Sequence, residues 1–146
     1  MKRLIQIVSL CLILSMVLGV PAMAAETGTR ASNYFHSYSC YLWKTSSTAF
    51  QVWFDVAGTH TMDEIGTSVI KVQRSSDGGN TWTTMKTYRM ADYASMTAEN
   101  AGVHVNCVTY SGASAGYKYR AYVEFYAKDG EGSAVYIDYT SAITMP

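Results

Sequence analysis

Proline is scarce in this chain of 146 residues and occurs only at positions 21 and 146. Because a proline within a strand removes a ladder hydrogen bond, its absence between these positions leaves every strand-like segment uninterrupted. The sequence also lacks any run of charges of one sign, and its formal net charge is zero. Without a basic stripe the chain is not typical of proteins that bind nucleic acid, so we expect no such partner.

Motifs for catalysis or metal binding are also lacking. His36, His60 and His104 are scattered and flank neither a G-x-S-x-G elbow nor an H-E-x-x-H pair. A glycosidase needs two carboxylates across a cleft, and no pattern orders the available ones in this way. These are Asp63, Glu64, Glu99, Glu124 and Asp138. Asp129 and Glu131 share a glycine-rich turn but supply too few oxygen ligands for calcium. We therefore expect no enzyme, no cofactor and no metal.

Long apolar runs are confined to the N-terminus, where residues 4–20 follow two basic residues. The run ends at Pro21, and Ala22 and Ala24 provide the small residues of a cleavage site. This pattern predicts a signal peptide over residues 1–24, removed after Ala24, and a secreted product. A retained membrane anchor is the alternative, but the run is short for a span. No later segment is long and apolar enough to cross a bilayer.

Aromatic residues are plentiful after residue 24, where all 12 Tyr, three Trp and four Phe residues lie. Tyrosine suits a pleated, half-buried surface with the ring inside and the hydroxyl outside, so this composition favours strands. Residues 25–32 are small and polar, and we expect a flexible segment there. Residues 33–146 are long enough to form a single domain with its own core.

Seven segments have the character of strands. The clearest is residues 50–56, where apolar residues alternate with Gln51, Trp53 and Asp55. The others are residues 33–44, 68–74, 83–88, 103–110, 117–127 and 135–139. Rings on both faces of residues 33–44 allow a bulge there. We expect a loop with one helical turn over residues 58–66 and a short helix between Asp92 and Gly102. This order predicts an all-β, seven-stranded antiparallel β-sandwich.

One stretch between two of these strands, Ser-Ser-Asp-Gly-Gly-Asn-Thr-Trp, resembles the hairpin called an Asp-box. Its motif residues are Ser75, Asp77, Gly79 and Trp82. We expect Asp77 to accept backbone hydrogen bonds, Gly78 or Gly79 to take a positive φ, and Trp82 to cover the hairpin. Sialidases and other propellers repeat this motif once per blade, whereas it occurs once here, in a chain too short for a propeller. We therefore interpret it as a structural turn.

The sequence Tyr-Lys-Tyr-Arg-Ala-Tyr-Val, which begins at Tyr117 and precedes a glycine-rich hairpin, resembles the sixth strand of fibronectin type III–like domains. The resemblance implies that Tyr117 or Tyr119 caps the sheet edge with a hydrogen bond to the backbone. Immunoglobulin-like sandwiches in general fit the same pattern. The chain after residue 24 also resembles small exported proteins of Gram-positive bacteria that have no assigned function.

Only two cysteines, Cys40 and Cys107, follow residue 24. An even pair in an exported protein indicates a disulfide. A bridge that closes so long a loop would contribute about 4 kcal/mol in the chain-entropy model. The alternative is two small buried side chains on separate strands.

A binding face is the remaining candidate site. In a sandwich, outward residues of neighbouring strands would combine rings with polar groups; they are Lys71, Gln73, Tyr122, Tyr126, Tyr136 and Asp138. Trp53 is a second exposed ring. Such a face suits a glycan or a partner protein, although tyrosines also form plain cross-strand pairs. We expect a non-enzymatic binding or interaction module at or outside the cell envelope. A glycan-active protein and a structural envelope or matrix component are the alternatives.

Overall fold

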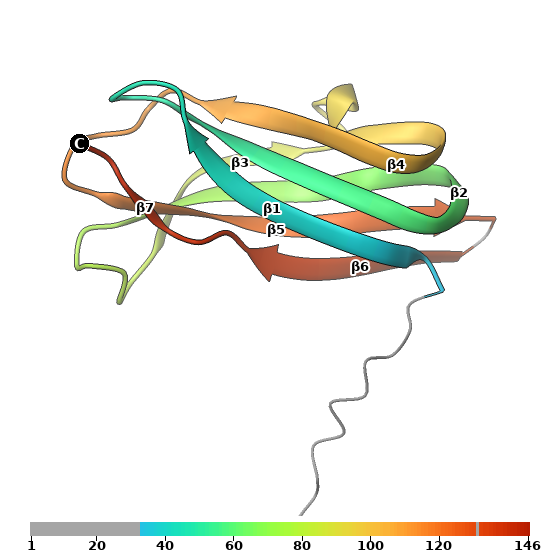
Figure 1. Cartoon of the computed structure of the whole chain (residues 1–146). Helices are drawn as coiled ribbons and strands as arrows, with labels where there is room; N and C mark the ends of the chain where they lie inside the picture. The colour runs from blue at the N-terminus through green and yellow to red at the C-terminus, as the bar shows by residue number, and fades with distance from the viewer. Residues whose placement is uncertain (1–32, 131) are drawn as a thin grey trace, which may run out of the picture. The chain divides into compact units, whose positions relative to one another are not determined.

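The structure, a computed structural model, describes residues 33–130 and 132–146. These residues form seven strands and one short 3-10 turn (Figure 1). The strands are β1 Phe35–Lys44, β2 Phe50–Ser75, β3 Thr83–Arg89, β4 Thr97–Tyr110, β5 Lys118–Asp129, β6 Gly132–Tyr139 and β7 Ile143–Thr144, and the turn η1 is Ala94–Met96. All pairings are antiparallel, which confirms the predicted all-β class. The predicted signal peptide over residues 1–24 and the segment 25–32 lie outside the described residues.

Strand β2, with 26 residues, organises the sheet. Its first half lies between β1 and β4, so that Phe54 is opposite Cys40 on one side and Asn106 on the other. Its second half lies between β3 and β5, so that Ile70 is opposite Tyr88 and Val123. Strand β6 continues the sheet beyond β5, and β7 pairs with the start of β5. Residues 33–130 and 132–146 thus form one curled sheet, a half-barrel (Figure 1).

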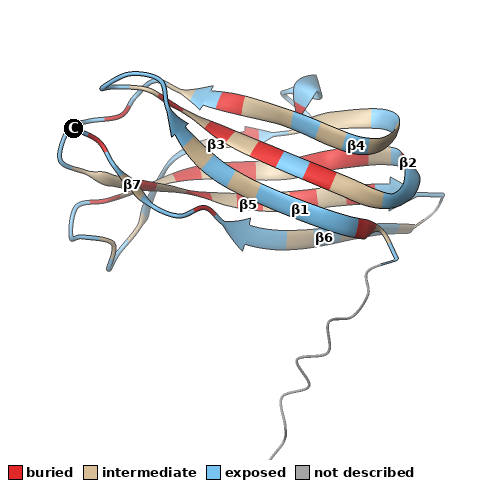
Figure 2. Cartoon of the chain, viewed as in Figure 1, coloured by how far each residue is buried: buried red, intermediate tan, exposed pale blue. Residues whose placement is uncertain are grey.

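The concave side of this sheet holds the core. Buried positions alternate along the strands (Figure 2). The largest fully buried side chains include Phe50, Phe54, Ile65, Ile70, Val72, Tyr119 and Phe125. The ring centroids of Phe50 and Tyr119 are 5.3 Å apart, and those of Tyr38 and Phe125 are 4.9 Å apart. Both halves of β2 therefore contribute to one core, and each such side chain contributes about 1.5–3 kcal/mol on burial.

The loop expected over residues 58–66 is wrong, because this stretch belongs to β2. Residues 62–66 pair with the start of β4, and residues 64–67 pair with the end of β5. Gly66 allows the close approach: its φ is +155°, and a Cβ there would lie 2.7 Å from the Cα of Thr97. Pairing with two neighbours overrides the local turn pattern, which glycines at both ends had suggested.

The helix expected between Asp92 and Gly102 is also wrong. Only Ala94–Met96 form a 3-10 turn, and β4 begins at Thr97. Tyr93 precedes the turn and provides no side-chain cap. So short a helix is marginal in water, whereas residues 97–101 gain a ladder with β2.

Of the two interpretations of the cysteine pair, the structure supports separate side chains rather than a bridge, because Cys40 and Cys107 are free thiols on β1 and β4. Cys40 lies opposite Phe54 and Cys107 lies opposite Trp53, so β2 separates them and their side chains project from opposite faces. Two strand spacings amount to about 10 Å, beyond the roughly 7 Å that a bridge permits between Cα atoms. Burial, and to a smaller extent the charge of Asp138, raises the pKa of Cys40 to about 12.

Tyr119 makes the backbone hydrogen bond implied by the fibronectin-like resemblance. Its ring is fully buried, and its hydroxyl accepts a hydrogen bond of 2.9 Å from the backbone N–H of Ser114. Tyr117 instead lies against Arg74, whose guanidinium carbon is 4.5 Å from the ring centroid. Tyr119 therefore fastens the β4–β5 connection to the core.

Candidate functional site

The turn between β2 and β3 is held by Asp77. Its Oδ1 accepts hydrogen bonds from the Ser75 hydroxyl at 2.7 Å, the Asn80 N–H at 3.1 Å and the Thr81 N–H at 2.9 Å. Its Oδ2 accepts one from the Thr81 hydroxyl at 2.6 Å. The Thr81 hydroxyl, then the Thr81 N–H and the Ser75 hydroxyl, hold the pKa of Asp77 well below its ordinary value. Both carboxylate oxygens therefore serve the turn itself.

The remaining residues of the Asp-box–like pattern also serve the hairpin. Gly78 and Gly79 have φ values of +78° and +108°, a region that glycine enters without strain. The indole N–H of Trp82 donates to the Gly79 carbonyl at 2.9 Å, and the Ser75 hydroxyl accepts from the Gly79 N–H at 2.8 Å. Their hydrogen bonds fit the structural interpretation of the motif.

The outward face of the second half of β2, β5 and β6, together with Trp82 just before β3, is a ladder of rings and cations. The Arg120 guanidinium carbon lies 4.3 Å from the ring of Trp82 and 4.5 Å from that of Tyr139. Tyr139 meets Tyr122 edge to face, and Lys71 Nζ lies 4.5 Å from the Tyr122 ring centroid. We call these five residues the cation–π ladder. Such contacts contribute about 0.5–1 kcal/mol each at exposed sites.

Hydrogen bonds also engage polar side chains on this face. Gln73 accepts a bond of 2.8 Å from Arg120 Nε, and Tyr122 donates one of 2.6 Å to Glu124. The bond to Glu124 is the main reason why the pKa of Tyr122 rises to about 12. Three predicted site residues, Lys71, Gln73 and Tyr122, are thus close together, but each already has a partner: Arg120 for Gln73, Glu124 for the Tyr122 hydroxyl and the Tyr122 ring for Lys71.

Two other members of the predicted face lie elsewhere. Tyr136 is opposite the core residue Phe125, and its ring contacts Phe35 at 5.3 Å and Tyr38 at 5.6 Å. Asp138 shares this side, since it lies two residues further along β6. Placing Tyr136 and Asp138 beside Tyr122 was therefore wrong, because β6 alternates in the opposite phase. Tyr126 keeps the predicted side and lies opposite Val135.

A second outward face, on β1, the first half of β2 and β4, carries rings with a different environment. Trp53 stacks on Tyr41 across the strand pair, with centroids 6.3 Å apart and planes inclined by only 4°. Trp43 lies two residues further along β1, on the same side as Tyr41. Trp43 is 62% exposed and Tyr41 is 49% exposed. We call Tyr41, Trp43 and Trp53 the aromatic platform.

Few groups compete for the platform. In the part of the chain that the structure describes, no cation lies over these three rings. Gln51 accepts a hydrogen bond of 3.0 Å from the indole N–H of Trp53, and exposed Asp55 projects from the same side of β2. The platform therefore combines rings that carry no cation, among the described residues, with neighbouring hydrogen-bonding groups. The sequence predicts that Trp53 is exposed, but not that Tyr41 and Trp43 lie beside it. The reason is that aromatic residues of β1 occur on both of its alternating sides.

A cavity of about 450 Å³ lies between β3 and β4. Its lining includes Lys86, Tyr88, Tyr93, Cys107 and Tyr110. The hydroxyl of Tyr88 donates to the Thr109 carbonyl at 2.7 Å, and that of Tyr110 donates to the Gly112 carbonyl at 3.1 Å. The bond from Tyr88 to Thr109 joins the β3 and β4 walls of the cavity. Nothing in the sequence predicts it, because neither edge strand pairs with the other.

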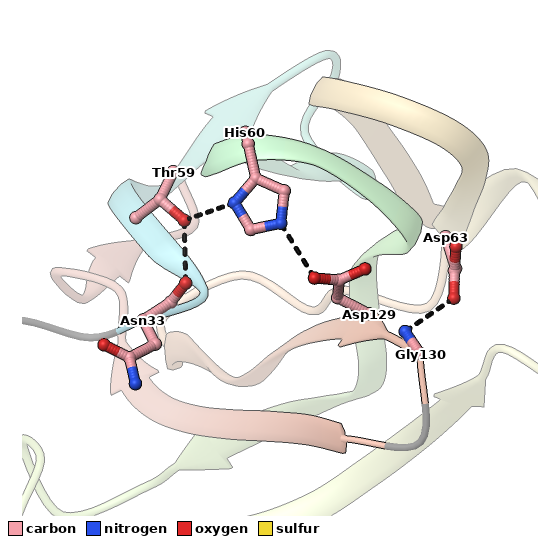
Figure 3. Close-up of polar contacts among 6 residues, drawn as sticks. All are labelled: Asn33, Thr59, His60, Asp63, Asp129 and Gly130. Carbon is pink, nitrogen blue, oxygen red and sulfur yellow. Dashed lines mark hydrogen bonds and ion pairs between the residues drawn. The ribbon is translucent and has the colours of Figure 1, made fainter.

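A polar cluster lies where β2 meets the β5–β6 turn (Figure 3). His60 Nε2 is 2.8 Å from Asp129 Oδ2, and His60 Nδ1 is 3.0 Å from the Thr59 hydroxyl. The arrangement of Thr59, His60 and Asp129 resembles that of a nucleophile, a general base and an orienting carboxylate in a catalytic site. However, the Thr59 hydroxyl donates its proton to the Asn33 carbonyl at 2.7 Å, and His60 and Asp129 are exposed. Asp63 accepts from the Gly130 N–H at 2.8 Å, so the cluster fastens the turn to β2.

Comparisons with known proteins add little. No family model and no curated protein matches the sequence. Among solved structures, the chain is similar to the sporulation control protein Spo0M from Bacillus subtilis, with 11% identity and a TM-score of 0.40. The match covers 73% of this chain and 49% of that protein, so this chain spans about half its length. Similarity at this level says nothing about function.

Residues 33–130 and 132–146 contain no group of three metal-binding side chains. No helix within these ranges is long and apolar enough to cross a membrane.

Proposed function

We propose that this protein is a secreted, non-enzymatic binding module whose aromatic platform stacks against carbohydrate. One observation carries the proposal: Tyr41 and Trp53 are nearly parallel, with Trp43 exposed on the same side and no cation over the rings of these three residues, among those described. Secretion rests on the signal-peptide pattern of residues 1–24.

The chemistry of the platform favours a sugar. The face of an aromatic ring is electronegative and attracts the polarised C–H groups of a pyranose. Gln51 and Asp55 supply oxygens for sugar hydroxyls at the border of the rings. Tyr41 and Trp43 are about 6.6 Å apart along β1, so a polymer of sugar units can contact both. The cation–π ladder supports binding less well, because its rings already hold Arg120 and Lys71.

We also infer that the curled sheet is a fibronectin type III–like sandwich. In this arrangement β1, the first half of β2 and β4 form one layer. The second half of β2 forms the other layer with β3, β5 and β6. The strand pairings and the buried hydroxyl of Tyr119 support the inference.

Glycan-array screening followed by titration calorimetry tests the binding proposal. We expect Trp53→Ala and Trp43→Ala each to weaken binding about tenfold, the equivalent of ~1.4 kcal/mol, because each removes one stacking ring. Tyr122→Ala is the matched control on the opposite face and should bind as the wild type does. Failure of the wild type to bind any glycan, or an equal loss in Tyr122→Ala, contradicts the proposal.

A further inference from the structure

Strand β6 is an edge strand with an apolar outward row. Within the described residues it pairs with β5 alone. Val135, Ile137 and Tyr139 are 51%, 54% and 46% exposed. The row therefore gives β6 an outward surface of large apolar side chains beside an unpaired backbone.

The backbone of β6 leaves hydrogen-bonding groups at this edge. The N–H of Thr140 donates to the Ala121 carbonyl at 3.0 Å, so even-numbered residues of β6 direct their N–H and C=O groups toward β5. The odd-numbered residues direct theirs toward the open edge. The N–H of Tyr139 is taken by the Asp138 carboxylate at 2.7 Å. Ser133, Val135 and Ile137 remain, and no strand of the described residues pairs with this side of them.

The edges of β1, β3 and β4 carry devices that discourage pairing. Strand β1 has a register shift between Phe35 and Ser37. Strand β3 contains a register shift, since Val72 lies opposite Lys86 but Gln73 lies opposite Thr84, and it carries Lys86 and Arg89. Such bulges and charges are the usual protection of sheet edges.

Strand β4 is protected by its neighbours. The carbonyl of Ser95 in η1 accepts a hydrogen bond of 2.9 Å from Asn106 Nδ2. The Asn106 side chain also accepts from the Cys107 N–H at 2.8 Å, and Tyr88 occupies the Thr109 carbonyl. By contrast, β6 has no lysine, arginine or proline, and its register with β5 is unbroken over the whole strand.

We propose that β6 pairs antiparallel with the β6 of a second copy, about a two-fold axis at Val135. In this register Val135 lies opposite Val135 of the second copy, and Ser133 lies opposite Ile137. Ser133, Val135 and Ile137 of each strand then supply all the hydrogen bonds between the two copies. Asp138 is the one charged residue of β6, and it falls opposite Gly132. No like charges meet, which makes the edge complementary to itself. An isologous contact of this kind closes at two copies.

Sedimentation velocity of the purified protein, expressed from the full coding sequence, tests the pairing. We expect a dimer at about 100 µM. Val135→Lys places two like charges at the axis, and Val135→Pro removes an edge N–H that has no partner within its own sheet; both should yield monomers. Val103→Lys is the matched control, because Val103 is 58% exposed on the protected strand β4; it should stay dimeric.

Circular dichroism and thermal unfolding will establish that each variant is folded. A wild type that stays monomeric overturns the proposal and leaves the edge to a strand of another protein. Loss of the dimer in Val103→Lys, its persistence in both Val135 variants, or growth beyond two copies overturns it equally. The glycan proposal is independent, since the aromatic platform lies on β1 and β2.

Discussion

At the scale of the residue, Asp77 shows how an exposed carboxylate can specify a hairpin. Its oxygens accept from Ser75, Asn80 and Thr81, and these bonds lower its pKa. A group whose pKa is lowered in the folded state stabilises that state at pH values above its unfolded pKa, about 3.9. This stabilisation is lost as the pH falls through the folded pKa.

We therefore expect Asp77→Asn to unfold at a lower temperature than the wild type at neutral pH. The difference should shrink between about pH 5 and pH 2, because protonation removes the same charge from the wild type. Thermal unfolding across this range measures the effect, with Asp92→Asn as a control in another turn. A difference independent of pH would show that the charge of Asp77 does not matter.

The thiols allow a second test at this scale. Because Cys40 and Cys107 are free and burial raises the pKa of both, the folded protein should alkylate slowly at pH values near 8. Mass spectrometry after iodoacetamide treatment should show two modified cysteines in the unfolded, unreduced protein and slower modification of the folded one. An unmodified pair after unfolding would instead establish the disulfide.

At the scale of the element, alternation along the chain predicts most strands but not where β2 ends. Phe50 to Val56 alternate cleanly, and this segment is a strand as predicted. Residues 58–66 carry glycines at both ends and read locally as a loop. They are extended because β4 and β5 provide partners that lie 30 to 65 residues away in sequence. Pairing between residues so far apart produces no periodic pattern of apolar residues in the sequence.

The aromatic platform, like the strands, could be predicted from the sequence only in part. The alternation of β2 exposes Trp53, whereas the outward position of Tyr41 depends on the register shift between Phe35 and Ser37. The wrong placement of Tyr136 has a related cause, because a strand's phase relative to its neighbour is set by pairing. The sequence shows which kinds of side chain are available for a site, but not which of them lie together in the fold.

Gly66 provides the test for this element. A side chain there would collide with the Met96 carbonyl and the Cα of Thr97, and φ is +155°. We expect Gly66→Ala to lower the free energy of unfolding by about 1–3 kcal/mol or more. In the control Gly102→Ala, the nearest atom to the new Cβ would be 3.7 Å away, which is ordinary contact. Urea unfolding of both variants measures the difference, and equal midpoints would contradict it.

At the scale of the described domain, the two outward faces differ in how their rings are used. The cation–π ladder joins Trp82, Tyr139 and Tyr122 to Arg120 and Lys71, and so stabilises its own sheet. The aromatic platform has no such cations among the described residues, and for this reason we propose it as the binding face. Aromatic content alone would have marked both faces equally; the positions of the cations separate them.

The continuity of β2 has a consequence for the dynamics of this domain. One unbroken strand belongs to both halves of the sheet, so neither half can open without disturbing the other. We therefore expect native-state hydrogen exchange to detect a single foldon, in which the slowest amides of Val52 and Ile70 exchange at the same free energy. Two distinct free energies would mean that the strand bends at Gly66 and lets the halves breathe separately.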